Sequence, residues 1–374
     1  MCIRDRVEAG NRLDLLAGND LVNKAGGIIA GRDVSLAATR GDVINERTLT
    51  SHQSSNGSYA QQRDFVDNAA RVEAANSLVI SAGRDINNNG GVLKSGADTS
   101  LKVGRDVNLS AVEQVVSNDR GVRYNDLSVT QNGSSLQAGR DLAISAGRDI
   151  TAIASQIEAK RDVAMTATEN LSLVSAANEQ HAYSKTKKVT SQEDHVQQVG
   201  TTLVAGGNVA LKAGEDLALT ASRVTAGDEA YLYAGGDVNL SAGQNSDYSY
   251  YRKTKTSSSG LSSSQKTRID SSNSITQQGS SVSGDTVVIR AGQDIGATAS
   301  DIVSTHSTSL VAGRNVEIDS ATETYEQSHS TSEKKSGLLS SGGIGFTLGS
   351  TSAQNTSSST CLLYTSPSPR DLST

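Results

Sequence analysis

The chain repeats a short unit at intervals of about 21 residues, and this period constrains its fold more than any local feature. Arg140-Asp141 precedes an apolar-small-apolar triplet, and an equivalent unit returns one period later at Arg161-Asp162. A further copy, Arg148-Asp149, lies between these two. A fixed period of about 20 residues with Gly and Asp at set positions is the signature of a repeat array.

The same interval recurs along the chain. It separates Arg84-Asp85 from Arg105-Asp106, Asp216 from Asp237, Asp294 from Asn315, and Asp64 from Asp85, where the context of Asp64 matches less well. Each alternating triplet predicts a very short strand with one buried face. The Gly that often precedes it supplies a backbone corner. A strand, a corner, a second strand and a return after one period predict one coil of a parallel β-solenoid.

Stacking explains why the coils repeat. A single coil cannot bury its apolar triplets, but a neighbour about 4.8 Å away completes the backbone ladder and closes a narrow core. We therefore predict an all-β fold, a right-handed parallel β-helix with coils of about 21 residues and periodic β-hairpin or loop excursions. About 240 residues remain after excursions and ends are removed, which corresponds to about eleven coils and a shaft about 50–55 Å long.

The Arg-Asp pairs have a structural and a metal-binding interpretation. Stacked Asp and Asn side chains could cap backbone N–H groups at the corners, with Arg offsetting the column of like charges. Repeat coils can also bind Ca²⁺, but through Gly-Gly-x-Gly-x-Asp nonapeptides, which this chain lacks. Arg also stands where an anionic cage would exclude it. We favour the structural interpretation and predict no metal site.

Composition agrees with a thin solenoid. The chain has 374 residues with 35 Gly, 3% aromatic residues and no Trp, too little bulky apolar material for a thick core. Its net charge of −6 argues against nucleic acid as a partner. A transmembrane helix needs about 20 consecutive apolar residues, and because the sequence contains no such run, we predict none.

Both ends of the sequence look foreign. The only two Cys are Cys2 and Cys361, and the only two Pro are Pro367 and Pro369. Residues 1–6 and 361–374 resemble translated adapter sequence, and we exclude both from the fold. Met1 is then not a true start, so a missing signal peptide says nothing about export. The absence of Pro from residues 7–360 suits an uninterrupted ladder, and the absence of Cys suits, without requiring, an exported chain.

Five segments interrupt the repeat. We assign residues 7–320 to the solenoid, with excursions near 46–76, 112–134, 177–200 and 244–281, and residues 321–360 to a last excursion. These segments are rich in Ser, Thr, Gln, Lys and Asn, and they contain most of the His and Tyr: His52, His181, His195, His329, Tyr59, Tyr124, Tyr183, Tyr248, Tyr250, Tyr251 and Tyr325.

The interruptions are themselves periodic. The triplets before them end at Leu109, Leu173, Leu240 and Ile318, which are nearly evenly spaced apart from a longer last step. We interpret this super-repeat as about three coils plus one excursion. The excursions are either long β-hairpins that carry interactions or solvated loops without a partner.

The repeats AGRDVSL, VGRDVNLSA, QAGRDLAISAGRDITA and AGGDVNLSAG resemble the haemagglutinin repeats of filamentous-haemagglutinin-type exoproteins of two-partner secretion systems. Residues 333–350, EKKSGLLSSGGIGFTLGS, resemble a segment of contact-dependent growth inhibition exoproteins, and residues 252–264 contain a degenerate copy. The resemblance implies a secreted, cell-surface filament shaft that presents or delivers a C-terminal toxin. It also implies two partners, an outer-membrane transporter acting through an N-terminal region outside this chain, and the target-cell surface or outer membrane. The alternative is a shaft segment of an adhesin without a toxin.

Gly342 to Gly349 alternates Ile344, Phe346 and Leu348 with small residues. Such a strand could belong to a membrane-spanning β structure, but a single segment favours an ordinary strand packed on the shaft.

Catalysis has little support in the sequence. β-Solenoids include polysaccharide-cleaving enzymes, but those need two converging carboxylates, and here acidic residues are spread one per corner and paired with Arg. The repeat segment has no Cys-His pair, no Gly-x-Ser-x-Gly elbow and no His-x₃-His spacing. We predict a non-enzymatic segment with no catalytic, cofactor-binding or metal-binding residues and no small-molecule substrate.

Overall fold

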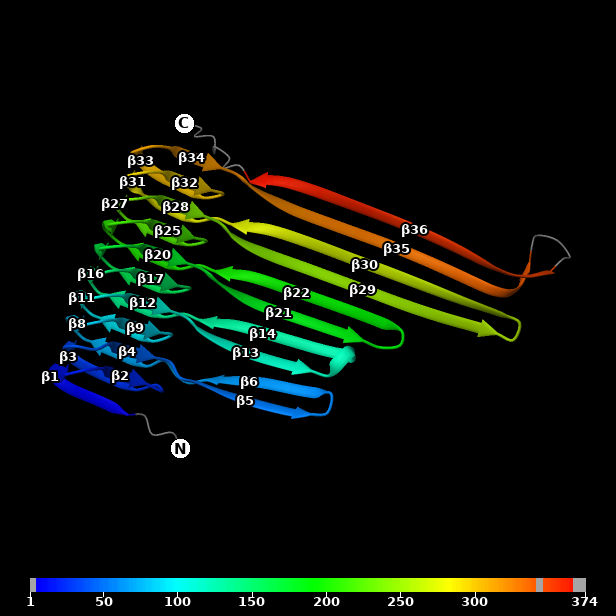
Figure 1. Cartoon of the computed structure of the whole chain (residues 1–374), viewed down its shortest axis with the longest axis horizontal. Helices are drawn as coiled ribbons and strands as arrows, with labels where there is room; N and C mark the ends of the chain where they lie inside the picture. Colours follow the sequence, from blue (N-terminus) through cyan, green and yellow to red (C-terminus); the bar gives the residue numbers. More distant parts are fainter. Residues whose placement is uncertain (1–4, 341–345, 366–374) are drawn as a thin grey trace.

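The computed structural model describes residues 5–340 and 346–365. Within these residues nearly everything is β-strand, apart from turns and one 3₁₀ helix, η1 (Gly121–Arg123). The chain winds into a stack of parallel coils, which we call the shaft, and antiparallel hairpins project from one side of it (Figure 1). The predicted all-β parallel β-helix with hairpin excursions is confirmed.

Each coil contributes one short strand to each of three sides of the shaft. The strands of the first side are β1 (Arg6–Ala17), β3 (Ile28–Ala38), β7 (Arg71–Ala74), β10 (Val92–Ser95), β15 (Ser135–Ala138), β18 (Gln156–Ala159), β23 (Thr202–Ala205), β26 (Arg223–Ala226), β31 (Ser281–Ala291) and β33 (Asp301–Ala312). The strands β1, β3, β31 and β33 continue around the corner onto the second side.

The second side also contains β8 (Leu78–Ala82), β11 (Thr99–Val103), β16 (Leu142–Ala146), β19 (Val163–Ala167), β24 (Val209–Ala213) and β27 (Glu229–Ala234). The third side contains β2 (Leu21–Lys24), β4 (Val43–Glu46), β9 (Ile86–Asn89), β12 (Val107–Ser110), β17 (Ile150–Ile153), β20 (Leu171–Val174), β25 (Leu217–Thr220), β28 (Val238–Ser241), β32 (Ile295–Thr298) and β34 (Val316–Asp319).

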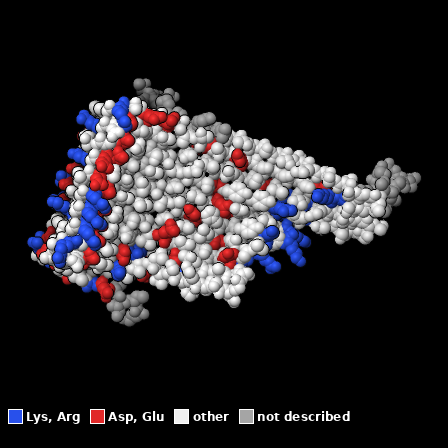
Figure 2. Space-filling model, in the orientation of Figure 1, with Lys and Arg blue, Asp and Glu red and all other residues white. Residues whose placement is uncertain are grey.

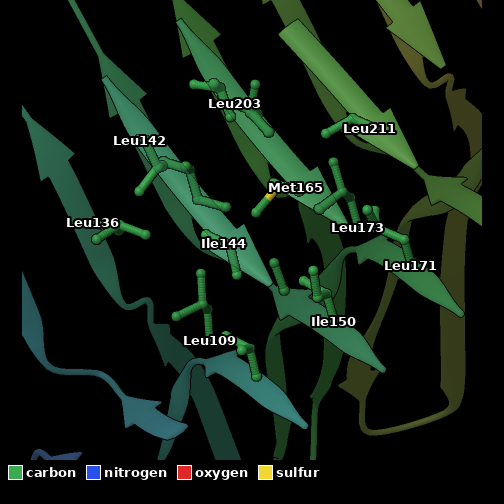
Figure 3. Packing of buried hydrophobic residues seen from close by; sticks show 14 of the residues in the cluster. Leu109, Leu136, Leu142, Ile144, Ile150, Met165, Leu171, Leu173, Leu203 and Leu211 are labelled. Atoms are coloured by element: carbon green, nitrogen blue, oxygen red, sulfur yellow. The ribbon is translucent and has the colours of Figure 1, made fainter. Parts of the chain in front are cut away.

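The core is a column of stacked apolar side chains inside the coils. Along β16, Leu142, Ile144 and Ala146 are buried while the residues between them are exposed, as the two-residue period of a strand requires. Ile144 pairs in register with Leu101 of one neighbouring coil and Met165 of the other. Figure 3 shows Leu142, Ile144 and Met165 among the buried side chains that pack between successive coils. Burying one such side chain contributes about 1.5–3 kcal/mol.

The predicted number of strands per coil is wrong. We predicted two strands per coil, but the structure has three, and the described residues form ten coils rather than about eleven. The missed strands lie on the first side. Segments such as Ser135–Ala138 contain one large buried apolar residue, Leu136, and lack the Arg-Asp signature, so their alternation is too weak to detect.

The corner glycines are required by stacking rather than by an unusual backbone conformation. Gly104 does not have a positive φ. A Cβ atom on Gly104 would lie 2.3 Å from the carbonyl oxygen of Gly83 in the preceding coil. The close approach of two backbones, and not a left-handed turn, therefore explains this part of the repeat.

The predicted Asp/Asn columns are present at the corners. The backbone N–H of Asp106 donates to Oδ1 of Asp85 over 3.1 Å, and the Arg105 side chain donates to both oxygens of the same carboxylate. This hydrogen bond from Arg105 holds the pKa of Asp85 below its ordinary value despite the partial burial of the carboxylate. The same N–H to side-chain contact follows at Asp149, Asn170, Asp216, Asp237, Asp294 and Asn315, each with the residue one coil earlier.

In the part of the chain that the structure describes, five hairpins leave the shaft at the corner between its third and first sides. We number them in chain order: hairpin 1 is β5 (Leu49–Asn56) and β6 (Tyr59–Val66), hairpin 2 is β13 (Val112–Asp119) and β14 (Tyr124–Asn132), hairpin 3 is β21 (Ala176–Lys185) and β22 (Val189–Val199), hairpin 4 is β29 (Gly243–Ser259) and β30 (Ser262–Gln278), and hairpin 5 is β35 (Ala321–Ser340) and β36 (Phe346–Thr365).

A hairpin follows every second coil, so the predicted super-repeat of three coils plus one excursion is wrong. At the intervening coils a tight turn closes the same corner, with Ala25, Gly90, Ala154, Ala221 or Ala299 at positive φ. Two coils and one hairpin account for the nearly even spacing of Leu109, Leu173 and Leu240. The spacing alone could not separate this arrangement from three coils, because the first hairpins are about as long as one coil.

The predicted range of the first excursion, residues 46–76, is too long. Residues Arg71–Ala74, which we placed inside the excursion 46–76, form β7 of the shaft. Asp64 was counted among the repeat positions, but it lies on β6 of hairpin 1. The alternating segment 342–349 lies partly outside the described residues; from Phe346 onward the chain belongs to β36.

Candidate interaction surface on the hairpin sheet

The hairpins join edge to edge into one antiparallel sheet of ten strands, the hairpin sheet. Its strands lengthen along the chain, from 8 residues in β5 to 20 in β35. Figure 1 shows this sheet standing off the shaft as a wedge whose longest hairpins are the last ones. The excursions that the sequence left open between hairpins and solvated loops are therefore ordered strands.

The hairpin sheet is two-sided and has little core of its own. In β29 every residue after Gly243 is partly or fully exposed. Its strands are built from Ser, Thr, Gln, Asn and Tyr, which form a continuous ladder without apolar burial on either face. A sheet of this kind is held by backbone hydrogen bonds and cross-strand side-chain pairs, and its side chains remain available to a partner.

Polar side chains join neighbouring hairpins. Asp64 of hairpin 1 accepts a hydrogen bond from the backbone N–H of Val115 in hairpin 2 over 2.8 Å, and one from Ser51 over 2.6 Å. Burial raises the pKa of Asp64, but these hydrogen bonds outweigh the burial and leave its pKa below the ordinary value. Asp64 thus fixes the contact between two hairpins rather than a corner of the shaft.

Three of the four histidines noted in the interruptions lie directly across a strand pair from an aspartate. His181 faces Asp194 within hairpin 3, and their side chains approach to 3.1 Å. His195 of hairpin 3 contacts Asp247 of hairpin 4 over 2.6 Å. His329 of hairpin 5 contacts Asp270 of hairpin 4. His52, the fourth, lies opposite Arg63 in hairpin 1.

His181 also contacts Glu179, over 3.3 Å. Partial burial lowers the pKa of His181, but the hydrogen bonds to Asp194 and Glu179 outweigh it, so the pKa is raised above its ordinary value. His181 and Asp194 line a shallow pocket of about 380 Å³ together with Asp126 and Tyr183. The sequence indicated the histidines as unusual residues, but not their partners, because each pair depends on the register between strands.

The tyrosines spread over the same sheet. At the end of hairpin 2 the guanidinium of Arg120 lies 5.5 Å from the ring centre of Tyr59 in hairpin 1 and 5.7 Å from that of Tyr124. Tyr183, Tyr248, Tyr250 and Tyr251 lie on β21 and β29, and Tyr325 lies on β35. The interruptions therefore place these histidines and tyrosines on one sheet, where they are distributed over both faces.

Charge is distributed differently on the shaft and on the hairpins. Figure 2 shows rows of basic and acidic side chains running along the shaft, which are the corner pairs of Arg with Asp. In the hairpin region of the same view, acidic residues lie nearer the shaft and basic residues lie farther out.

Neither catalysis nor metal binding gains support from the geometry. Within residues 5–340 and 346–365, no group of three or more His, Cys, Asp and Glu side chains is placed to hold a metal ion. In that same part of the chain, no helix is long and apolar enough to cross a membrane.

Comparison with known families agrees with this architecture. The haemagglutinin repeat family matches residues 6–58 and 60–118 in one form, and residues 118–193, 182–272 and 258–361 in a second. The chain belongs to the haemagglutinin repeat family, whose units here are the coils and hairpins described above.

Several curated proteins are similar over nearly the whole chain. The 16S rRNA endonuclease CdiA of Enterobacter cloacae is 35% identical over 92% of this chain, and the tRNA nuclease CdiA of Escherichia coli strain STEC_O31 is 33% identical over 92%. The deoxyribonuclease CdiA of Dickeya dadantii is 32% identical over 88%. The chain spans only 10–11% of the length of these relatives. No solved structure matches the chain.

Proposed function

We propose that this chain is a structural segment of a large secreted exoprotein, a stretch of filament shaft that presents or delivers a C-terminal toxin in contact-dependent growth inhibition. The observation that carries the proposal is the similarity of 88–92% of the chain to proteins named as CdiA nucleases of three different specificities. Since the nuclease named differs while this region stays similar, the shared region supports delivery rather than one chemistry.

The chain itself performs no catalysis in this proposal. The relatives carry nuclease names, but the matched part is a repeat array that makes up about a tenth of them. The Asp residues most regularly placed in the fold are used at the corners, where Asp85 and its equivalents accept backbone and Arg hydrogen bonds. These carboxylates are spread along the shaft, whereas hydrolysis requires two of them to converge.

The full protein would be exported through an outer-membrane transporter of a two-partner secretion system and would lie on the bacterial cell surface, facing the target cell. Residues 7–320 would supply the shaft and its first four hairpins, and residues 321–360 the last hairpin. The family match runs from residue 6 to residue 361, and we propose that the residues beyond it are foreign, although β36 pairs with β35 as far as Thr365.

A chimera tests delivery. Residues 7–360 replace the matched region of the Enterobacter cloacae relative, and inhibitor cells carrying the chimera are mixed with target cells. We expect the chimera to reach the cell surface and to reduce the number of viable target cells, as the parent protein does. A chimera with Ile144→Asp, which disrupts the coil stack, is the matched control and should not inhibit growth.

The adhesin alternative makes the opposite prediction for the same strains. If the chimera is displayed at the parental level and attaches to target cells without inhibiting them, delivery by this segment is wrong. Sequencing the native locus gives an independent check. A nuclease-like domain beyond residue 360 with a small immunity gene after it supports delivery, whereas further repeats without such a domain support an adhesin.

A further inference from the structure

Hairpin 4 carries a block of four basic side chains, of which the fold pairs only one, Arg268, with a carboxylate. Lys253 on β29 lies directly opposite Arg268 on β30, and Lys255 lies directly opposite Lys266. The two pairs are two residues apart along each strand, so all four side chains project from the same face of the sheet. All four are exposed.

The neighbouring hairpins add little negative charge to this face. Arg268 is paired with Asp270, which also contacts His329. On β35 Glu333 lies opposite Lys266, but its carboxylate is bound by Lys335 at 3.2 Å and by Ser264. On β22 the residue opposite Lys253 is Val189. Among the described residues no carboxylate forms an ion pair with Lys253, Lys255 or Lys266.

This arrangement contrasts with the shaft, where most corner arginines reach an Asp of an earlier coil. Like charges directly across a strand pair destabilise a sheet. Two such pairs in succession therefore cost stability, which the ion pair of Arg268 with Asp270 offsets for only one of the four cations. An anionic partner that lies on this face would remove the repulsion.

Two observations indicate which kind of anion would bind this face of hairpin 4. The cations form a flat array, spaced about 5 Å across strands and about 7 Å along them, which suits many phosphates in a layer better than one bound ion. Amphipathic and aliphatic side chains accompany them: Tyr251, two residues from Lys253 on the same face, is 37% exposed, and Leu261 at the turn of hairpin 4 is 73% exposed. Cations combined with Tyr and an exposed aliphatic residue are typical of proteins that lie on a lipid headgroup layer.

We propose that this face of hairpin 4, with Lys253, Lys255, Lys266 and Tyr251, docks onto phosphate-bearing lipid headgroups of a membrane surface. The inference deepens the proposed function, because it names the chemistry of the surface that the segment contacts. It is tested on the isolated chain without export or toxin, so vesicle binding and the chimera assay can fail independently.

The test is co-sedimentation of the full chain with two kinds of vesicle, one of phosphatidylcholine alone and one of two parts phosphatidylcholine to one part phosphatidylglycerol. We expect binding to the anionic vesicles, weakened by added salt, and little binding to the neutral ones. The triple variant Lys253→Gln, Lys255→Gln and Lys266→Gln should bind the anionic vesicles about 100-fold more weakly, given the usual contribution of each lysine near an anionic surface.

A matched triple variant on the shaft, Lys94→Gln, Lys102→Gln and Lys160→Gln, makes the same change in net charge at exposed positions away from the hairpins. It should bind like the unaltered chain. Circular dichroism and the thermal transition of both triple variants show that the fold is kept. Equal losses in the two triple variants, or equal binding to both kinds of vesicle, would overturn the proposal.

Soluble polyanions provide the last arm. A single-stranded oligonucleotide and a sulfated polysaccharide are added in turn to the chain without vesicles. If either binds through the three lysines while the anionic vesicles do not, the partner is a soluble polymer and the assignment to lipid is wrong.

Discussion

At the scale of single residues, the fold depends on which side of a short strand each side chain occupies. In β16 the choice is between Ile144, which is 2% exposed, and its neighbour Ser145, which faces solvent. The two positions differ only by the alternation of the strand, so the same substitution at each isolates the effect of the narrow core.

We expect Ile144→Asp to lower the free energy of unfolding by about 4 kcal/mol or more, because it places an unpaired carboxylate between Leu101 and Met165. Leu240 is 1% exposed, and we expect Leu240→Asp to lower the free energy of unfolding by a similar amount. Ser145→Asp is the control and should change stability by less than about 0.5 kcal/mol. Thermal and urea unfolding followed by circular dichroism measure all three. An unchanged transition for Ile144→Asp would mean that the side chain does not point inward.

The residue scale also shows how much the sequence could predict. The repeat period and the corner pairs such as Arg105-Asp106 could be predicted from the sequence, because each coil must repeat the same contacts with its neighbour. The reason for Gly104 was not, since a close approach to Gly83 depends on the stacking distance and not on local conformation. The pairing of Lys253 with Arg268 was equally hidden, because only the register of hairpin 4 places them opposite each other.

At the scale of elements, hairpin 3 contains a titratable cross-strand contact. His181 has a raised pKa in the folded chain, since its hydrogen bonds to Asp194 and Glu179 outweigh the effect of burial. A raised folded pKa stabilises the protonated form, so the contribution is fully present below the unfolded value of about 6.5 and is lost as pH rises through the folded pKa.

We therefore expect hairpin 3 to be more stable at pH 6 than at pH 8. Hydrogen exchange of the amides of β21 and β22, corrected for the intrinsic effect of pH, should show stronger protection at pH 6. His181→Gln should abolish the difference. The amides of β13, a strand without histidine that does not pair with hairpin 3, serve as the internal control. Equal protection at both pH values would show that this contact does not stabilise the hairpin.

Hairpins and coils are also separable elements. At the corner that hairpin 3 occupies, the preceding coil has a tight turn of two residues, Ala154 and Ser155, between strands. Removing residues 175–199 leaves Gly200 and Thr201 in the same places, with Gly at the position that adopts positive φ. The Thr201 hydroxyl would keep its hydrogen bond from the backbone N–H of Ser155.

We expect this deletion to leave the shaft folded and to lower its thermal midpoint by no more than about 4 °C, the shift that about 1 kcal/mol produces. The hairpin sheet would lose its pairing of β14 with β21 and of β22 with β29. Deleting Val163–Ala167, a strand of the second side, is the control and should abolish cooperative unfolding. A shaft that unfolds after the hairpin deletion would contradict the independence of the two parts.

At the scale of the whole molecule, stability is a sum over neighbouring coils. Every coil pairs with the next coil in parallel register, and each hairpin pairs with the next hairpin. Contacts beyond nearest neighbours do not hold the stack together, as expected for a repeat array. The super-repeat of two coils and one hairpin could not be derived from the sequence. It sets the distance between successive hairpins along the shaft. Because all five described hairpins leave the same corner at this spacing, they can pair into one sheet.

The stack also predicts how the segment behaves in solution. In the described residues the last coil contributes β33 and β34, whose outer edges have no further coil to pair with. Ile318 of β34 continues the inward column of Leu240 and Ala297, yet it is 61% exposed. An unpaired parallel edge above an exposed apolar column favours pairing with another chain.

We therefore expect residues 7–360 to self-associate end to end, with an average mass that rises with concentration in sedimentation equilibrium. Ile318→Lys should shift this association to higher concentration, because stacking another coil would bury the ammonium group. Glu317→Lys places the same side chain at the adjacent outward-facing position and should leave association largely intact. A segment that stays monomeric at millimolar concentration, or equal effects of the two substitutions, would show that the open coil is not the surface that pairs.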